Sequence, residues 1–344
     1  MTESTKRAKP ATIYDVAVKA GVSKSTVSLV IRGASNVSPE KKAAVEAAIG
    51  ELGYRPSRFA QQLASHKTRS IGVVITDYKN LSYLGFLKGL REILDDAGYQ
   101  VIVSDLHRSP NFAEDPVDAF ISMKVDGLVL ATEPAGLRTH NLDIPCVMIG
   151  KRETLVDGAD IVFNDDSFGT RLALEHLKAF GHTNVAHLTG LGGIALNRRE
   201  AFIQLAKELG LAGYVFGQGQ PTTEIGGYMG AKELLASGRQ VSAVYCANDY
   251  MAAGAISALQ EAGVRVPEDL SVIGYDNAPI ASDYLLKLTT IDEQGVAVGR
   301  QVAALLLERI TSKSNYKPKS ILIEPTLVTR TSVAAPQRVK QLKR

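Results

Sequence analysis

The sequence of 344 residues predicts a small all-α helix-turn-helix domain followed by an α/β core of two lobes, each with a parallel sheet. Residues 12–52 carry the start, turn and stop signals of three short helices. From residue 71 onward, short apolar runs of β type alternate with helical stretches, which is typical of parallel sheets covered by helices. Charge divides at the same place, because residues 1–69 contain 12 Lys and Arg against 5 Asp and Glu, and the remainder 27 against 31. This division indicates that only the N-terminal module binds a polyanion.

The first two helices are predicted from residues 12–33. Thr12 and Ser23 can each cap a helix, because a side-chain hydroxyl accepts a hydrogen bond from an unpaired backbone N–H. Gly21 falls where a tight turn needs a positive φ. Val27 and Val30 give the second helix an apolar side at i and i+3. This order is the pattern of a DNA-binding helix-turn-helix, and an ordinary pair of surface helices is the alternative.

A third helix is predicted at 38–52, with Ser38 as its N-cap, Pro39 at its first position and Gly53 at its end. Its predicted apolar face consists of Ala43, Ala44, Val45, Ala48, Ile49 and Leu52. Residues 56–64 form at most a marginal helix, because nucleation of so short a helix is unfavourable. Residues 65–70 are predicted to be a linker.

Two series of apolar β-type runs follow this linker. The runs lie at 71–75, 101–103, 128–131 and 146–149, then at 185–188, 214–216, 243–246 and 272–274. In the second series the strands start about 29 residues apart, the length of one βα unit. We therefore expect two similar doubly wound lobes, with a ligand in the cleft at the carboxyl ends of their strands.

Several classes of protein are disfavoured by the sequence. No apolar run reaches the ~20 residues that span a bilayer, and no signal peptide is evident, so we expect a cytoplasmic protein with no membrane partner. Cys146 and Cys246 lie far apart in apolar runs and are predicted to be buried thiols. The sequence has no spacing of His or Cys that is typical of metal ligands. It also has no phosphate-binding loop, because Gly-Leu-Gly-Gly at 190–193 lacks the spacing that such a loop requires. We expect no metal, no cofactor and no enzymatic activity.

The chain resembles transcriptional regulators of the LacI (lactose repressor)/GalR family over nearly its whole length. The resemblance rests on the order and spacing of several motifs. In the N-terminal part they are Ile-Tyr-Asp-Val-Ala, Ala-Gly-Val-Ser and Thr-Val-Ser within 13–28, Val-Ser-Pro-Glu at 37–40 and Leu-Gly-Tyr-Arg-Pro-Ser at 52–57. In the core they are Gly-His at 181–182, Ala-Asn-Asp at 247–249, Val-Pro-Glu-Asp-Leu-Ser-Val-Ile-Gly-Tyr-Asp at 266–276 and Leu-Thr-Thr-Ile at 288–291.

The resemblance implies a helix-turn-helix domain at 1–55, a hinge helix and linker at 56–70, and a core like periplasmic binding proteins at 71–335. A basic tail follows at 336–344. The chain should cross between the lobes near residues 163, 293 and 324. The resemblance also implies a homodimer on a pseudo-palindromic operator of double-stranded DNA, with a small effector in the cleft that changes DNA affinity. The tail lacks apolar heptads, which favours a dimer over a tetramer.

The same resemblance implies the DNA-binding residues. They are Thr12, Tyr14, Ser23, Lys24, Ser25, Thr26, Ser28, Leu29, Arg32, Arg58, Ala60 and Leu63. Lys24 can donate to guanine or to a phosphate, whereas Leu29 offers only apolar contact. Leu63 matches the hinge-helix leucine that relatives insert into the minor groove, and packing of Leu63 on its own core is the alternative.

The effector-binding residues implied by the resemblance are Asp77, Phe163, Arg198, Asn248, Asp276 and Glu293. A guanidinium such as that of Arg198 can donate to paired sugar hydroxyls. Each of these residues could instead cap a helix or join a structural ion pair. Glu293 replaces a common Gln, which puts a disaccharide effector in doubt.

We therefore predict a ligand-responsive repressor of genes for sugar uptake or catabolism, with a sugar as the preferred effector. The alternative effector is a nucleoside or nucleobase, or a phosphorylated metabolite, acting as corepressor. More remote alternatives are a sugar-binding transport protein and an enzyme on a doubly wound fold.

Overall fold

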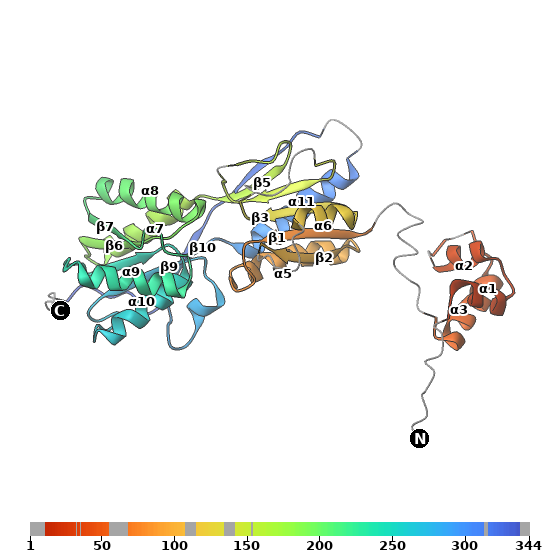
Figure 1. Ribbon diagram of the computed structural model, residues 1–344, viewed down its shortest axis with the longest axis horizontal. Helices are drawn as coiled ribbons and strands as arrows, with labels where there is room; N and C mark the ends of the chain where they lie inside the picture. Colours follow the sequence, from red (N-terminus) through yellow and green to blue (C-terminus); the bar gives the residue numbers. More distant parts are fainter. Residues whose placement is uncertain are drawn as a thin grey trace, which may run out of the picture. The chain divides into compact units, whose positions relative to one another are not determined.

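The computed structural model describes residues 11–31, 33–34, 36–54, 68–106, 115–133, 142–152, 154–312 and 316–337 (Figure 1). It divides into two compact units, residues 1–68 and residues 69–344. The predicted hinge helix at 56–64, including Arg58, Ala60 and Leu63, lies outside the described residues, as does Arg32.

The N-terminal unit contains helices α1 (Ile13–Ala20), α2 (Lys24–Ile31) and α3 (Pro39–Leu52). Thr12 forms a capping box with Asp15, and Gly21 has a φ of 64° in the turn, as the sequence predicts. The hydroxyl of Ser23 accepts from the backbone N–H of Thr26 at 3.2 Å and so caps α2. Val27 and Val30 are buried in the shared core.

The predicted face of α3 is partly wrong. Val45 and Ala48 are buried, but Ala43 and Ala44 are exposed. Helices α1 and α2 together cover only a narrow part of the surface of α3, so only the residues at the centre of its predicted apolar face reach the core. Ser38 occupies the N-cap position, but its side chain makes no capping hydrogen bond.

The first lobe of the second unit, here called the N-lobe, has the sheet order β11-β5-β4-β3-β1-β2 (Figure 1). Its elements are β1 (Ser70–Ile75), α5 (Tyr83–Asp96), β2 (Gln100–Asp105), α6 (Pro116–Ser122), β3 (Gly127–Ala131), β4 (Cys146–Ile149), β5 (Asp160–Asn164), α11 (Gly295–Thr311) and β11 (Ser320–Ile323). Helices α5 and α11 pack on one face of the sheet and α6 on the other, in two aliphatic clusters.

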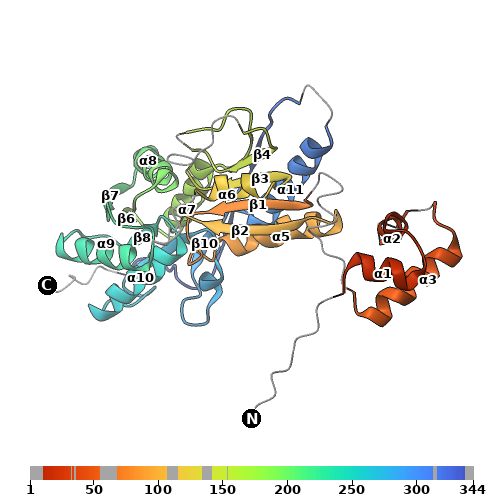
Figure 2. The same ribbon diagram turned by 45° about the vertical axis from the view of Figure 1, so that its right-hand side comes forward.

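The other lobe, here called the C-lobe, has the order β12-β10-β9-β8-β6-β7 (Figure 2). Its elements are α7 (Asp166–Ala179), β6 (Asn184–Leu188), α8 (Gly193–Glu208), β7 (Ala212–Phe216), α9 (Glu224–Ala236), β8 (Ala243–Cys246), α10 (Asp249–Glu261), β9 (Ser271–Tyr275), the 3₁₀ helix η1 (Pro279–Ser282), β10 (Thr289–Asp292) and β12 (Thr326–Val328). Helices α9 and α10 cover one face, and α7 and α8 the other.

All eight predicted strands are present, at most two residues longer at either end than predicted. Four further strands, β5, β10, β11 and β12, did not stand out as apolar runs because they are short and carry polar residues. The predicted parallel sheets are confirmed, with one antiparallel pair at an edge, where β12 lies beside β10. The chain reaches β12 directly from β11 of the other lobe, with no crossover helix to reverse its direction.

Both lobes contain a pair of helices in very close contact. On α5, a Cβ atom added to Gly89 would lie 2.0 Å from the carbonyl oxygen of Val296 in α11. On α9, a Cβ atom added to Gly227 would lie 1.9 Å from the carbonyl oxygen of Met251 in α10. The two helix pairs can approach this closely only because the contact residues are glycine.

Candidate functional site

The start of α2 presents a group of polar side chains from the predicted DNA-binding set. The Lys24 ammonium donates to the Tyr14 hydroxyl at 3.2 Å and lies 4.8 Å from the centroid of the Tyr14 ring. The hydroxyl of Ser23 is 2.7 Å from that of Ser25 and 2.9 Å from that of Thr26. Tyr14, Lys24 and Ser25 are exposed, so a polyanion can reach them.

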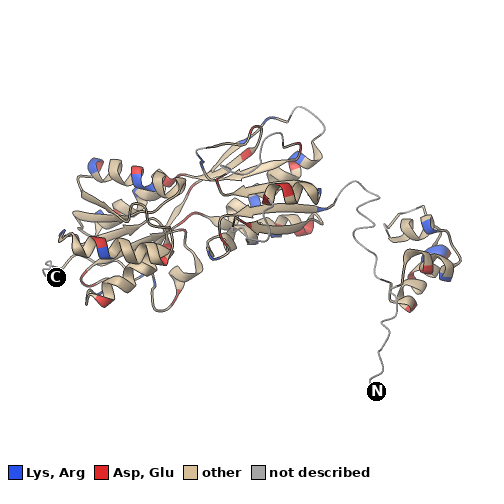
Figure 3. Cartoon of the chain, in the orientation of Figure 1, with Lys and Arg blue, Asp and Glu red and all other residues tan. Residues whose placement is uncertain are grey.

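Three other described members of that set are engaged or partly covered. Thr12 is exposed, but its hydroxyl takes part in the cap of α1, and Ser28 and Leu29 are half-buried in α2. The described residues of the three helices include four lysines and four acidic residues, so their charges balance. Figure 3 colours these residues blue and red. The basic excess of residues 1–69 therefore comes from the segments around these helices.

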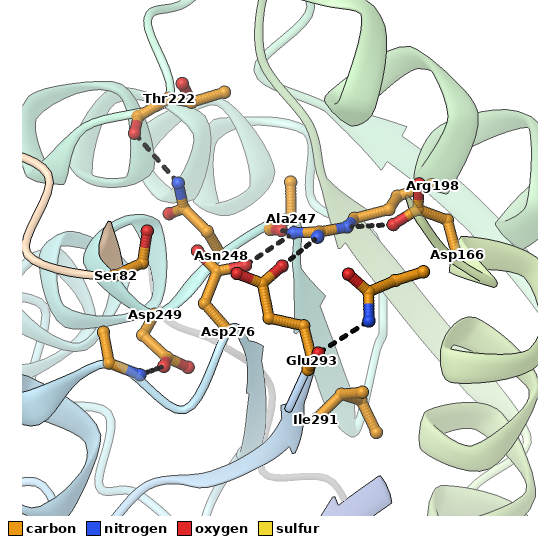
Figure 4. A network of polar contacts seen from close by, with 12 residues as sticks. Ser82, Asp166, Arg198, Thr222, Ala247, Asn248, Asp249, Asp276, Ile291 and Glu293 are labelled. Carbon is orange, nitrogen blue, oxygen red and sulfur yellow. Dashed lines mark hydrogen bonds and ion pairs between the residues drawn. The ribbon is translucent and has the colours of Figure 1, made fainter. Parts of the chain in front are cut away.

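A buried ion cluster lies in the second unit around Arg198 of α8, whose side chain is only 4% exposed (Figure 4). Its Nε donates to Asp166 Oδ1 at 2.9 Å. Its Nη1 donates to Asp276 Oδ1 at 2.9 Å and to the carbonyl oxygen of Ala247 at 2.7 Å. Its Nη2 lies 3.6 Å from Glu293 Oε2, the one longer contact in the cluster.

The guanidinium is also held from one face, since its central carbon is 3.4 Å from the centroid of the Tyr275 ring. Asp276 directly follows β9 and Glu293 follows β10, so both carboxylates lie at the carboxyl ends of neighbouring parallel strands. Asp166 opens α7, immediately after the chain leaves β5. The topology of the sheet therefore assembles a cluster from segments more than one hundred residues apart.

The cluster carries more negative than positive charge, because three carboxylates surround one guanidinium. Burial raises the pKa of Glu293 to about 8, and the carboxylate of Asp276 adds to this effect while Arg198 opposes it. Burial also raises the pKa of Asp276, against the opposing effect of Arg198. The raised pKa values show that further negative charge is unfavourable here, so the cluster disfavours a partner that is itself an anion.

Two cavities are lined by residues of both lobes, and the first of them includes members of this cluster. The first, of about 380 Å³, is lined by Asp276 and Glu293, by Ser82 of the N-lobe, and by the N-terminus of α11. The second, of about 350 Å³, is lined by Glu133 of the N-lobe and by the start of α8. Arg152 approaches Glu133 at 3.7 Å, and its side chain is 9% exposed.

Of the six predicted effector residues, the structure brings Arg198, Asp276 and Glu293 together. Asn248 instead caps α10, accepting from the N–H of Met251 at 2.8 Å, and donates to the carbonyl oxygen of Thr222 at 3.0 Å. Phe163 lies in β5 with the Lys151 ammonium 4.8 Å from its ring centroid. Asp77 lies in the turn after β1 and accepts from the N–H of Lys79 at 2.8 Å. None of these three lines the larger cavity.

Sequence reasoning missed Asp166, Tyr275 and Arg152. Tyr275 could have been noticed as the residue before Asp276. Asp166 had a weaker signal, the consecutive acids Asp165 and Asp166 where a strand gives way to a helix.

Comparison with known proteins places this geometry in a family. Residues 12–57 match the model of bacterial regulatory proteins of the lacI family, and residues 174–333 match a periplasmic binding protein-like domain. The HTH-type transcriptional repressor PurR of Pectobacterium carotovorum is 34% identical over 335 residues, covering 94% of this chain and 97% of the relative. The chain belongs to the lacI family of bacterial regulatory proteins. It is a DNA-binding transcriptional repressor and not an enzyme.

Solved structures of the lacI family agree with the fold. A lac repressor dimer bound to operator and the anti-inducer ONPF superposes with a TM-score of 0.82 at 30% identity, covering 95% of this chain and 100% of that one. A LacI-family regulator from Corynebacterium glutamicum is 35% identical, with a TM-score of 0.69 over 79% of this chain and all of its own. Within the described residues, no helix is long and apolar enough to cross a membrane.

Proposed function

We propose that the chain is a homodimeric repressor whose affinity for a pseudo-palindromic operator is set by a neutral nucleobase or nucleoside bound beside Arg198. The single observation that carries the effector class is the Arg198 Nη2–Glu293 pair. The name PurR of the Pectobacterium carotovorum relative described above favours this class over the sugar that we first preferred from the sequence. The homodimer is supported by the likeness to the lac repressor dimer.

The sugar prediction assumed a guanidinium free to donate to paired hydroxyls. In the structure Nε and Nη1 of Arg198 are already engaged by Asp166, Asp276 and a backbone carbonyl. Only Nη2 remains without a short hydrogen bond, and its neighbour is the carboxylate of Glu293 at 3.6 Å. A donor beside an acceptor complements the edge of a nucleobase, where a ring nitrogen or carbonyl acceptor adjoins an N–H.

Charge disfavours the phosphorylated alternative. A phosphate near Arg198 would meet Asp166, Asp276 and Glu293, which outnumber this guanidinium. The larger cavity adds one cation, Arg330, but also one more carboxylate, Asp292, so the acidic groups still prevail. Removal of a phosphate from water without a compensating cation is costly. A neutral ligand avoids this repulsion.

A ligand panel on the full chain tests the effector class. We expect hypoxanthine, guanine, adenine, uracil or their nucleosides to raise the melting temperature, and ribose, glucose and glucose 6-phosphate to leave it unchanged. Glu293→Gln should weaken nucleobase binding about tenfold, roughly one lost hydrogen bond to a charged group. Glu308→Gln is the matched control, because Glu308 is an exposed partner of Lys319 on the N-lobe. Stabilisation by a sugar alone would contradict the proposal.

The DNA-binding surface is tested by selecting operators from random palindromic DNA with the full chain, with and without the effective nucleobase. We expect Lys24→Ala to cost about 1–3 kcal/mol on the selected operator if Lys24 contacts a base. Equal losses on operator and on random DNA would show that Lys24 contributes only electrostatic attraction.

A further inference from the structure

Three segments connect the N-lobe to the C-lobe. The first runs from the end of β5 at Asn164 to the start of α7 at Asp166. The second runs from the end of β10 at Asp292 to the start of α11 at Gly295. The third runs from the end of β11 at Ile323 to the start of β12 at Thr326. We call these segments the three crossovers, and any change in the angle between the lobes must bend all of them.

One side chain joins all three crossovers. The Nδ2 of Asn164, in the first crossover, donates to the carbonyl oxygen of Glu293 in the second at 2.6 Å. It also donates to the carbonyl oxygen of Ile323, at the start of the third, at 3.2 Å. Both hydrogens of one amide are thereby used, and the planar amide fixes the direction of each. A side chain with one donor could join only two of the crossovers.

The same crossovers also meet at the buried ion cluster. Glu293 is bound through its carbonyl oxygen by Asn164, and its carboxylate lies beside Arg198 Nη2. Asp166, two residues after Asn164, accepts from Arg198 Nε. A ligand that binds both Nη2 and the carboxyl group of Glu293 therefore contacts a residue whose backbone carbonyl Asn164 holds.

We propose that Asn164 is a positioning residue of the effector site, which sets the relative placement of the three crossovers and limits how far the lobes open. Its contact with Glu293 connects occupancy of the cleft to this opening. The connection to effector binding rests on the function proposed above, whereas the limit on lobe opening does not.

The competing explanation is that Asn164 only stabilises its own surroundings. Asn184 provides a matched comparison, because its Nδ2 donates to the carbonyl oxygen of Gln240 at 3.0 Å within the C-lobe. Both side chains make bonds of the same kind, but only Asn164 joins segments that move when the lobes move. Loss of the two Asn164 bonds and loss of the one Asn184 bond should both lower stability, and only loss of the Asn164 bonds should alter lobe opening.

The test measures the distance between the lobes in the full chain. Spin labels at Lys88→Cys on α5 and Gln204→Cys on α8 occupy exposed helical positions. Cys146 and Cys246 are free but buried, which favours labelling of the introduced thiols. Dilution with unlabelled chain leaves at most one labelled copy in each dimer.

We expect the distribution of interlobe distances to become at least about 1.5-fold broader in Asn164→Ala and in the nearly isosteric Asn164→Asp, and to keep its width in Asn184→Ala. Circular dichroism at the measuring temperature confirms that each variant is folded, and Asn164→Asp serves as the second variant. Unchanged width in both Asn164 variants would overturn the proposal. Broadening in Asn184→Ala as well would equally overturn it.

Binding of hypoxanthine gives the second readout. We expect its affinity to fall about tenfold in Asn164→Ala and to be retained in Asn184→Ala. If the wild-type chain binds no nucleobase, the proposed effector class fails, while the interlobe distances still decide the role of Asn164. Equal hypoxanthine affinity in wild-type and Asn164→Ala chains would remove the connection between Asn164 and the effector site.

Discussion

The two lobes share one architecture and differ in what they bury. Each has a six-stranded sheet covered on both faces by helices, and each contains a helix pair in contact at glycine. The N-lobe core clusters are apolar, and the described charged side chains that this lobe buries most deeply are the acids Asp115 and Asp160. The C-lobe buries Arg198, His187 and Asp249 in addition to its apolar core. The shared scaffold therefore sets the shape of the cleft, whereas much of its chemistry comes from the C-lobe.

The largest expected difference between the lobes concerns their buried arginines. Arg198→Met leaves three carboxylates around an apolar side chain, and we expect the free energy of unfolding to fall by about 3–5 kcal/mol. Arg152→Met in the N-lobe removes a contact of 3.7 Å to Glu133, which is 31% exposed, and the hydrogen bond from Nε to the carbonyl oxygen of Ile149 at 2.9 Å, so we expect a loss of about 1–2 kcal/mol. Urea denaturation at pH 7.5 measures both values. If Arg198→Met and Arg152→Met lower the free energy of unfolding equally, the buried arginine contributes no more to stability in the C-lobe than in the N-lobe.

Acid should weaken the C-lobe through His187. The imidazole packs against the rings of Phe202 and Tyr245, and its Nδ1 donates to the carbonyl oxygen of Tyr245 at 2.9 Å. Burial lowers the pKa of His187 to about 3 from an ordinary value of 6.5. The folded state thus holds the neutral ring, and its contribution is complete above pH ~6.5 and is lost as the pH falls toward ~3.

We therefore expect His187 to lower the free energy of unfolding by about 3 kcal/mol between pH 7 and pH 4. His187→Phe keeps the ring stack but has no titratable group, so its urea midpoint should depend less on pH over this range. Parallel pH profiles for wild-type and His187→Phe chains would show that other groups cause the acid sensitivity.

The glycine contacts should behave alike in both lobes. We expect Gly89→Ala and Gly227→Ala each to cost about 1–3 kcal/mol, because the added methyl group would force the paired helices apart. Gly85→Ala in α5 and Gly230→Ala in α9 are matched controls, since their nearest neighbours lie at 3.7 and 3.4 Å. These controls should be tolerated, because Ala also favours the helix by about 1 kcal/mol. A large loss in only one lobe would show that the two helix pairs are not equivalent.

The repeated architecture was predictable from sequence, but much of the cleft was not. Central strands such as β1 and β8 are short apolar runs between turn signals, which local pattern detects. Strands β10 and β12 contain threonines and an aspartate, and their place is decided by pairing with distant strands. The strand-end position of Asp276 could be predicted, whereas the approach of Asp166 to Arg198 could not. Local sequence does not record contacts between segments so far apart.

The smallest expected difference concerns one fully buried carboxylate in each lobe. Asp160 of the N-lobe accepts from the N–H of Lys319 at 2.7 Å and from Arg309 Nη1 at 3.4 Å. Asp249 of the C-lobe accepts from Thr290 Oγ1 at 2.6 Å and the N–H of Ala278 at 2.7 Å, and burial raises its pKa well above the ordinary value. The contribution of Asp249 is therefore greatest below its ordinary pKa and is lost as the pH rises.

At pH 8 we expect Asp160→Asn to lower the free energy of unfolding by about 1 kcal/mol, because it weakens a bond to a charged partner. Asp249→Asn should leave it unchanged or raise it by up to about 1 kcal/mol, because burial outweighs the hydrogen bonds and the attraction of Arg330 that favour the charged carboxylate. Urea denaturation at pH 8 and pH 5 measures both variants, and any gain from Asp249→Asn should shrink at pH 5, where the wild-type carboxyl is more fully protonated. If Asp249→Asn lowers the free energy of unfolding as much as Asp160→Asn does, the partners of Asp249 stabilise its carboxylate as well as the partners of Asp160 do.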